Sequence, residues 1–473
     1  MIARPTELTN AGDVRVDADD ARRWVVVTVF MVGGYLVLQR SFAYLGIPAL
    51  NLFIGDVVLF AFVLFRPQVS IRRFVEALLH PSPLGAVAWA MFFLLLYGLV
   101  LAVRGFAAGY PRLLVFQELV FNIYPLYILL GLWLGERDPK LLERFMLGVA
   151  WVVGIYGMLY VAVLNHSTAA IPGTDLLLFR APLGQGAALL ALLAFRPKGA
   201  RMWLPFILNL LVLLGVQNRA AYAGFAAGLI VWAVMSKRIG RTLLVASVFV
   251  ALLAVAWILD LRIELAKGAS EYSARNVAAA VIAPFDEEAA ARFSSDARSF
   301  AGTVEWRKAW WAGIWDGTHS DVVRTAIGTG YGFELTSDAV LRSSAADLRT
   351  PHNWFMYALG YGGWIGVLLF VFLLLSLGSL LWRADRMTGV AFGVPFLVLS
   401  TAVATFSNFY ETPFAAIPLW VITGMCIAPV VRNGGLGRVT SGRGSAASGA
   451  ASSARLRSAS RRVDRPEGSW VTP

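Results

Sequence analysis

The stretch TPHNWFMYALGYGGWIGVLLFVFLLL, residues 350–375, places a histidine and an asparagine at the mouth of a long apolar run. A helix needs roughly 20 consecutive apolar residues to cross a hydrocarbon core of about 30 Å, and the run after Asn353 supplies them. It predicts a transmembrane helix that Asn353 caps. Capping explains Asn353 and close helix packing explains the glycines at 360–366, but neither explains His352.

The same pattern extends over the whole chain of 473 residues. Its hydrophobic fraction is 58%, its charged fraction is 15%, and its mean hydropathy is +0.66, whereas soluble proteins are about 25% charged. The composition predicts an all-α polytopic membrane protein with about 12 transmembrane helices. The expected spans are approximately 24–39, 50–65, 84–103, 113–134, 144–164, 182–195, 202–217, 220–235, 242–259, 353–381, 389–407 and 413–431.

The net charge of +12 is concentrated in particular segments rather than distributed evenly along the chain. Lysine and arginine cluster in alternate short connections, which the positive-inside rule assigns to the cytoplasm. We therefore expect both termini on the cytoplasmic side and interpret the basic charge as a membrane signal, not as nucleic-acid binding. The predicted organisation is a tail at 1–22, helices at 23–260, an extracytoplasmic loop at 261–352, helices at 353–431, and a disordered basic tail at 432–473.

The long loop breaks the pattern of short connections, because residues 261–351 carry ten Lys/Arg and twelve Asp/Glu. A loop of this length without structure is unusual unless it is functional. Between Gly302 and Trp315, Trp306, Trp310 and Ile314 recur at helical spacing. We expect an amphipathic helix that lies on the membrane surface or covers a cavity.

Three arginines stand where a positive charge is costly or unexpected. Arg219 opens a predicted span on the outer side, Arg180 precedes another, and Arg307 lies on the expected amphipathic helix. An arginine at a membrane boundary either extends its charge to the interface or faces a polar cavity. For Arg307 the simpler alternative is a solvated helix face.

The sequence does not predict a metal or nucleotide site. None of the four histidines has a second histidine three or four residues away, and the single Cys426 supports neither a disulfide framework nor a thiolate metal site. The acidic run at 286–288 is interpreted as a solvated helix start. The GTGYGF segment at 328–333 lacks a strand–turn–helix context, so we interpret it as a tight turn. We expect no cofactor.

At this point the chain resembles the O-antigen ligase and O-antigen polymerase superfamily of bacterial membrane glycosyltransferases. The resemblance rests on four motifs in order, and it is strongest over residues 200–375. They are Asn218-Arg219 at a span, Arg307-x-x-x-Trp311 in the outer loop, Gly328-x-Gly330, and His352-Asn353 followed by Gly363-x-x-Gly366.

This resemblance implies an enzyme in the bacterial cytoplasmic (inner) membrane. Its donor would be a glycan on a polyprenyl diphosphate, and its acceptor a glycan or lipid-linked sugar hydroxyl, with membrane lipids as neighbours. Arg219, Arg307 and His352 would be catalytic. The arginines would hold the diphosphate without a metal, and His352 would be the base. A single displacement would invert the anomeric centre. Further substrate-binding candidates are Arg180, Asn353, Trp311 and Gly363.

Two alternatives stay open. A polymerase of the same superfamily would differ in its acceptor, which would be the end of a growing glycan. A flippase or transporter is the alternative from another class, but such proteins show paired halves and ionisable residues near the midplane of the membrane. Here the candidate residues cluster at one face.

Overall fold

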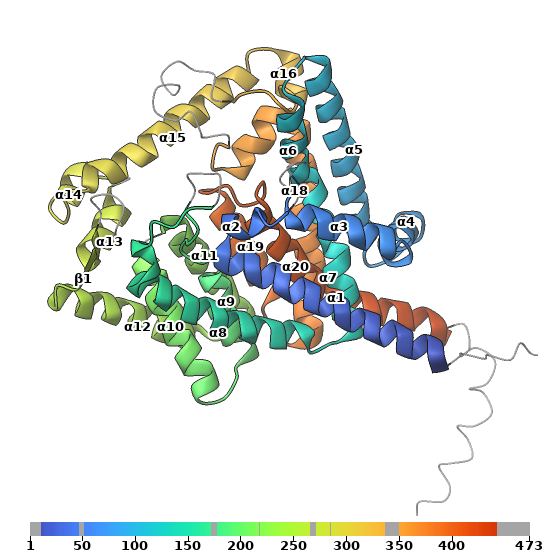
Figure 1. The fold of residues 1–473 in the computed structure, drawn as a ribbon, viewed down its shortest axis with the longest axis horizontal. Coiled ribbons are helices and arrows are strands. Elements are labelled where there is room, and N and C mark those ends of the chain that lie inside the picture. The colour runs from blue at the N-terminus through green and yellow to red at the C-terminus, as the bar shows by residue number, and fades with distance from the viewer. Residues whose placement is uncertain are drawn as a thin grey trace, which may run out of the picture.

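The computed structural model describes residues 11–46, 52–171, 177–216, 218–264, 271–283, 285–335 and 350–441. Most of the described residues lie in helices, and the same ranges contain one short antiparallel pair of strands and one isolated bridge. The predicted all-α class is therefore confirmed (Figure 1). The tails at 1–10 and 442–473 lie outside the described residues.

The N-terminal half is built of helices. Its elements are α1 (Ala11–Leu38), α2 (Arg40–Ala43), α3 (Ile54–Phe65), the π-turn η2 (Gln68–Arg72), α4 (Arg73–Leu79), α5 (Gly85–Ala107), α6 (Arg112–Ile123), η3 (Tyr124–Leu126), α7 (Tyr127–Arg137), α8 (Leu141–Ala162), η4 (Leu164–His166), α9 (Gln185–Phe195), α10 (Ala200–Val216), α11 (Arg219–Ser236) and α12 (Ile239–Ile258).

The outer segment and the C-terminal helices follow. They are β1 (Arg262–Glu264), β2 (Glu271–Ser273), α13 (Ala274–Ile282), α14 (Glu287–Ala291), α15 (Ala297–Thr318), α16 (Val322–Ile327), α18 (Trp354–Thr388), α19 (Gly393–Ala404) and α20 (Pro413–Ser441).

The predicted apolar runs all correspond to helices in the described part of the chain. Eight helices are long and apolar enough to cross a membrane, and the bent pair Ile54–Phe65 and Gln68–Leu79 makes a ninth if it is one span. Three shorter apolar helices, α9, α10 and α19, account for the remaining runs. A multi-pass membrane protein follows, whereas twelve complete spans and the cytoplasmic position of both termini remain predictions.

The centre of the bundle is α20, which packs closely along α7. Within its span, 83% of the residues are buried. Glycines allow the two backbones to touch, since a Cβ at Gly131 would lie 1.9 Å from the Val421 carbonyl oxygen and one at Gly424 would lie 2.2 Å from that of Ile128. Such small-residue contacts are the usual way in which membrane helices approach one another.

The segment predicted as an extracytoplasmic loop folds into strands β1–β2 and helices α13–α16, with residues 265–270, 284 and 336–349 undescribed. Alanines of α13, α14 and α15 form a small separate core. The expected amphipathic helix lies inside α15, and Trp310 and Ile314 are buried as its apolar face. In Figure 1 α15 extends along one side of the molecule from α14 to α16.

Candidate functional site

His352 and Asn353 lie immediately before the first turn of α18. The Asn353 side chain accepts hydrogen bonds from the backbone N–H groups of Phe355 (2.9 Å) and Met356 (3.2 Å), which confirms the predicted N-cap. His352 has φ of 51°, in the left-handed region that a residue with a Cβ rarely adopts. Its ring meets the edge of Trp306 on α15, with centroids 6.4 Å apart. The backbone at the start of α18 therefore places the His352 ring against α15.

Arg219 opens α11 and reaches into the outer segment. Asn218 caps this helix, accepting from Ala220 N (3.0 Å) and Ala221 N (3.3 Å). The Arg219 guanidinium donates to Thr303 Oγ1 at 2.7 Å and faces the carbonyl oxygens of Phe300 and Ala280, each at 3.4 Å. It is thus engaged by α13 and α15 rather than extended along the membrane surface.

Arg307 lies on α15, one turn beyond Thr303. Its guanidinium lies 5.5 Å from the ring of Trp306 and donates to the Phe406 carbonyl oxygen at 3.4 Å. Burial, and next the positive charge of Arg219, lower the pKa of Arg307. Among the described residues no aspartate or glutamate forms an ion pair with either arginine. Two partly buried cations that lack a counter-charge form a site suited to an anion.

The loop that meets Arg307 carries one acidic residue, Glu411. Burial raises the pKa of this carboxyl to about 8. Glu411 is therefore mostly protonated at neutral pH and does not supply the missing negative charge. Its position could not be deduced from the sequence, where it follows an apolar run without any distinguishing pattern.

His352 is electrostatically coupled to Arg307. Burial, and next the charge of Arg307, lower the pKa of His352 from 6.5 to about 4. The imidazole is consequently neutral at pH 7 and can accept a proton. The three residues predicted to be catalytic thus gather around α15, although they are separated by 133 positions in the sequence from Arg219 to His352.

The other candidates have different surroundings. The Trp311 indole donates to the Pro351 carbonyl oxygen at 2.8 Å, directly before His352. Gly363 has φ of 58°, and a Cβ there would lie 2.5 Å from the carbonyl carbon of Ala326. These contacts tie Trp311 to the residue before His352 and bring the backbone at Gly363 against that of Ala326, and direct contact of either residue with substrate remains a prediction.

Arg180 has separate surroundings. Burial lowers its pKa, as does the charge of Arg40, and Tyr156 donates to its backbone carbonyl at 3.1 Å. Within the described residues no hydrogen bond, ion pair or ring contact joins Arg180 to Arg219, Arg307 or His352. Its part in donor binding therefore also remains a prediction.

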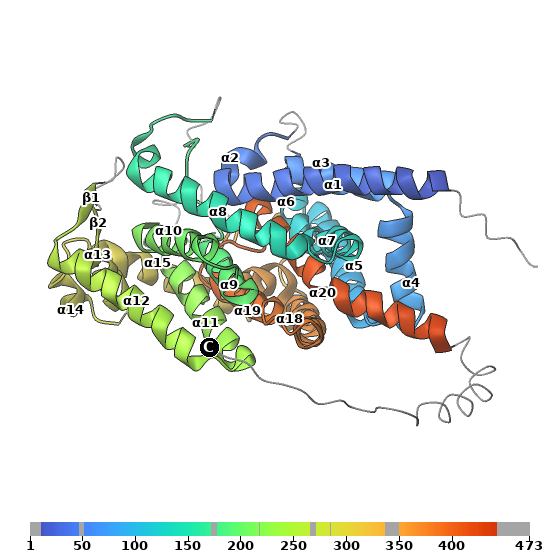
Figure 2. The same ribbon diagram turned by 90° about the horizontal axis from the view of Figure 1, so that it is seen from below.

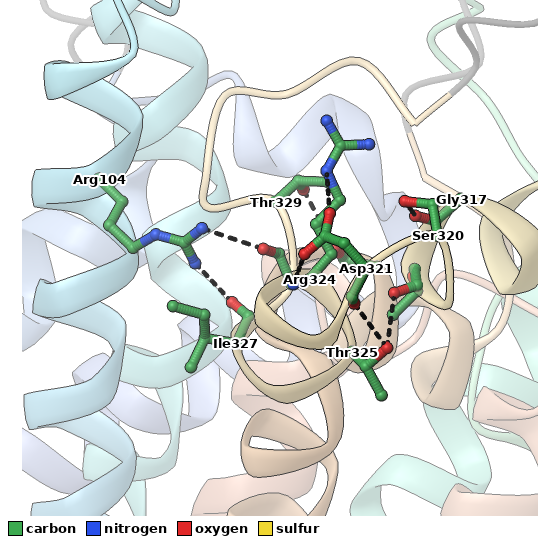
Figure 3. A network of polar contacts seen from close by, with 11 residues as sticks. Arg104, Gly317, Ser320, Asp321, Arg324, Thr325, Ile327 and Thr329 are labelled. Carbon is green, nitrogen blue, oxygen red and sulfur yellow. Dashed lines mark hydrogen bonds and ion pairs between the residues drawn. The ribbon is translucent and has the colours of Figure 1, made fainter.

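The GTGYGF segment forms the expected tight turn, and helices from the N-terminal half hold it. Arg104 of α5 donates to the carbonyl oxygens of Ile327 (2.6 Å) and Gly328 (3.1 Å), as Figure 3 shows. Glu118 of α6 accepts from the backbone N–H of Gly332 and from the Tyr361 hydroxyl. The turn thus connects α5, α6 and the first turns of α18. Arg104 and Glu118 were not singled out from the sequence, because nothing local marks contacts more than 200 residues distant.

The described residues hold no group of three or more His, Cys, Asp or Glu side chains that could hold a metal ion.

Comparison with known proteins gives one family. Residues 204–371, about a third of the chain, match the family model Wzy_C, described as O-antigen ligase. The matched segment extends from α10 into α18 and includes Arg219, Arg307 and His352. The match confirms the resemblance to the O-antigen ligase and polymerase superfamily. No curated protein matches the chain. The coarse assignment is a multi-pass membrane protein of the ligase and polymerase type.

Proposed function

We propose that this chain is an O-antigen ligase-like membrane glycosyltransferase. It transfers a glycan from a polyprenyl diphosphate, such as undecaprenyl diphosphate, to an acceptor sugar hydroxyl on the extracytoplasmic face of the bacterial cytoplasmic membrane. The observation that carries the proposal is the meeting of two arginines without counter-charges, Arg219 and Arg307, beside a neutral His352.

The leaving group sets the first requirement. As the glycosidic bond breaks, the diphosphate takes the bonding electrons and gains negative charge. Arg219 and Arg307 present planar donors that match phosphate oxygens, and charge-assisted bonds in a partly buried site stabilise that charge. No divalent cation is needed for this step.

The acceptor sets the second requirement. Its hydroxyl oxygen attacks the anomeric carbon and must lose its proton, which His352 accepts. A weakly basic imidazole is a poor acceptor, but the bound diphosphate offsets the charge of Arg307 and raises the basicity of His352. One displacement at the carbon inverts its configuration.

A polymerase of the same superfamily would use the same site with another acceptor. Deleting the gene and analysing the surface polysaccharide separates the two reactions. Full-length glycan left on its lipid carrier indicates a ligase, whereas single repeat units indicate a polymerase. A change in transport alone, with transfer intact in membranes, would instead indicate a flippase or transporter.

The test of the site itself compares donor affinity with the single-turnover rate. Arg219→Ala and Arg307→Ala should weaken both, and Arg219→Lys should cost about 10- to 150-fold in rate, since a charge-assisted hydrogen bond contributes roughly 1.5–3 kcal/mol. His352→Ala should bind donor normally and react about 10²- to 10⁴-fold more slowly.

Arg324→Ala is the matched control. Arg324 also lies in the outer segment, but it is exposed and paired with Asp321 at 3.5 Å, so its replacement should leave both quantities unchanged. A His352→Ala variant that reacts at the normal saturated rate but binds donor weakly would show that His352 is not the base.

A further inference from the structure

Helix α3 and the segment formed by η2 and α4 meet at a bend of 84°, and Figure 2 shows α4 turned away from α3. Pro67 stands at this bend. The π-turn η2 follows it, with the Arg72 amide donating to the Pro67 carbonyl oxygen at 2.9 Å. Single π-turns often occur at functional sites. The bend brings η2 and α4 to the end of α7, where Arg73 forms a bidentate ion pair with Glu136.

Between η2, α4 and the end of α7 lies a cavity of about 520 Å³, within the usual range for small-molecule sites of roughly 300–1,000 Å³. Gln68, Arg72 and Glu76 line it from η2 and α4, and Trp133 and Arg137 line it from α7. The Arg73–Glu136 ion pair forms a further part of its wall. We call this cavity the α4–α7 pocket. Its walls are polar and charged, and none of the residues proposed for glycan transfer lines it.

The α4–α7 pocket contains hydrogen-bond donors that the protein does not use. Glu136 is paired with Arg73, and Glu76 accepts from Arg72 Nε at 2.8 Å. The two terminal amino groups of Arg72 make no hydrogen bond within the part of the chain that the structure describes. Trp133 is 4% exposed, and its indole N–H has no hydrogen-bond partner among the same residues. A buried donor without an acceptor is costly, so the pocket is suited to a ligand that supplies acceptor oxygens.

The charge of the pocket favours an anion. Three arginines and two glutamates line it, which leaves one positive charge in excess. The Arg137 guanidinium lies 5.4 Å from the centre of the Trp133 ring. The positive-inside rule explains why basic residues occur in this connection, but it does not require them to surround one cavity together with a buried tryptophan. Guanidinium and indole N–H donors around a positively charged cavity match the oxygens of a phosphate group.

The outward face of η2 and α4 is apolar. Ile71, Val75 and Leu79 recur at every fourth position and are exposed, whereas Arg72 and Glu76, at the same spacing, line the α4–α7 pocket. A helix with one apolar and one charged face that lies across the direction of a neighbouring span is suited to the membrane interface. The polar pocket and the apolar stripe thus occupy adjacent faces of one segment, which is the arrangement that an amphiphilic ligand requires.

We propose that the α4–α7 pocket binds the phosphate group of an anionic membrane phospholipid, whose acyl chains lie beside Ile71, Val75 and Leu79. The pocket belongs to the connection between the second and third predicted spans, which we assign to the cytoplasmic side, where basic pockets between membrane helices bind anionic headgroups. The inference is independent of the proposed function. A free phosphate ion shares the chemistry of the headgroup but lacks the apolar part, so the experiment separates these two sources.

The test titrates the purified full-length chain, in a neutral detergent, with phosphatidylglycerol, phosphatidylcholine or inorganic phosphate. The apparent Kd follows from the dependence of the thermal unfolding midpoint on ligand concentration. Phosphatidylglycerol should raise the midpoint of the wild type most. Arg72→Gln should raise the Kd for phosphatidylglycerol about tenfold, because a charge-assisted hydrogen bond is lost. Trp133→Phe keeps an aromatic ring but removes the N–H, and should raise this Kd about threefold.

Arg144→Gln is the matched control. Arg144 is exposed and paired with Asp138 in the next basic connection, and it does not line the α4–α7 pocket, so the same change of charge there should leave the Kd unchanged. Because Arg72 is exposed, its variant keeps the test decisive even if Trp133→Phe fails to fold. Equal stabilisation by phosphatidylcholine, or equal losses of affinity in Arg72→Gln and Arg144→Gln, would refute the site. Inorganic phosphate that binds as tightly as phosphatidylglycerol would refute the assignment to a lipid.

Discussion

The protonation of His352 gives the sharpest prediction, because its pKa is shifted far from the ordinary value. Burial and the charge of Arg307 lower it from 6.5 to about 4. A group with pKa 4 is about nine-tenths neutral at pH 5, whereas an ordinary histidine is only about 3% neutral there. The base form should therefore persist in the free enzyme at a pH where most histidines are charged.

The sign of the shift fixes the pH profile. The acid limb of kcat/KM, which reports the free enzyme, should lie near pH 4. The limb of kcat should lie about 1–3 units higher, because the bound diphosphate offsets Arg307. Arg307→Gln removes a positive charge and should move the limb of kcat/KM upward by about one unit. The same shift affects the free energy of unfolding. Between pH 6.5 and 4 the histidine of the unfolded chain binds a proton that His352 of the folded protein does not, so stability should fall as the pH is lowered from 6.5 to 4.

The assay measures single-turnover rates at saturating and limiting donor between pH 3.5 and 8. Arg324→Gln controls for the loss of one arginine, and residual activity in His352→Ala should lack the acid limb. A second measurement does not depend on catalysis. In a variant that lacks the other three histidines, the rate of chemical acylation of His352 as a function of pH should report the same pKa. Limbs of kcat/KM and kcat that coincide near 6.5, or a limb that Arg307→Gln leaves in place, would refute the coupling of His352 to Arg307.

Three further predictions concern topology, packing and metals. Single cysteines at positions 294 and 441, in a background without the native cysteine, should differ in intact cells, with only Ser294→Cys labelled by an impermeant thiol reagent; labelling of Ser441→Cys alone would reverse the orientation. Gly363→Ala should destabilise the protein by about 1–3 kcal/mol, because the φ of Gly363 is 58° and a Cβ there would lie 2.5 Å from neighbouring backbone. Gly378→Ala is the control and should not destabilise the protein, because its Cβ would meet nothing closer than 3.9 Å. Thermal unfolding in detergent compares the two variants, and equal midpoints would contradict the reasoning. Activity should survive a chelator, and rescue of a chelated enzyme by Mg²⁺ would reveal a metal site that neither the sequence nor the described residues show.

The sequence by itself determined the elements that depend on local interactions. In a membrane every backbone polar group must be satisfied within the segment, so a long apolar run such as 85–103 forms a helix whatever its neighbours are. Capping is equally local, since Asn353 reaches amides two and three residues ahead. The amphipathic face of α15 followed from spacing alone. The motifs around Arg219, Arg307 and His352 were also visible, together with the family that they resemble.

Only the tertiary structure decided what those residues can do together. The contact of Arg219 with Thr303 joins positions 84 residues apart, and that of Arg104 with Ile327 joins positions 223 apart. The depressed pKa of His352 requires burial and a neighbouring charge, neither of which is a property of the local sequence. The physical reason is that backbone hydrogen bonding acts within a segment, whereas burial and charge coupling depend on which segments the whole fold brings together.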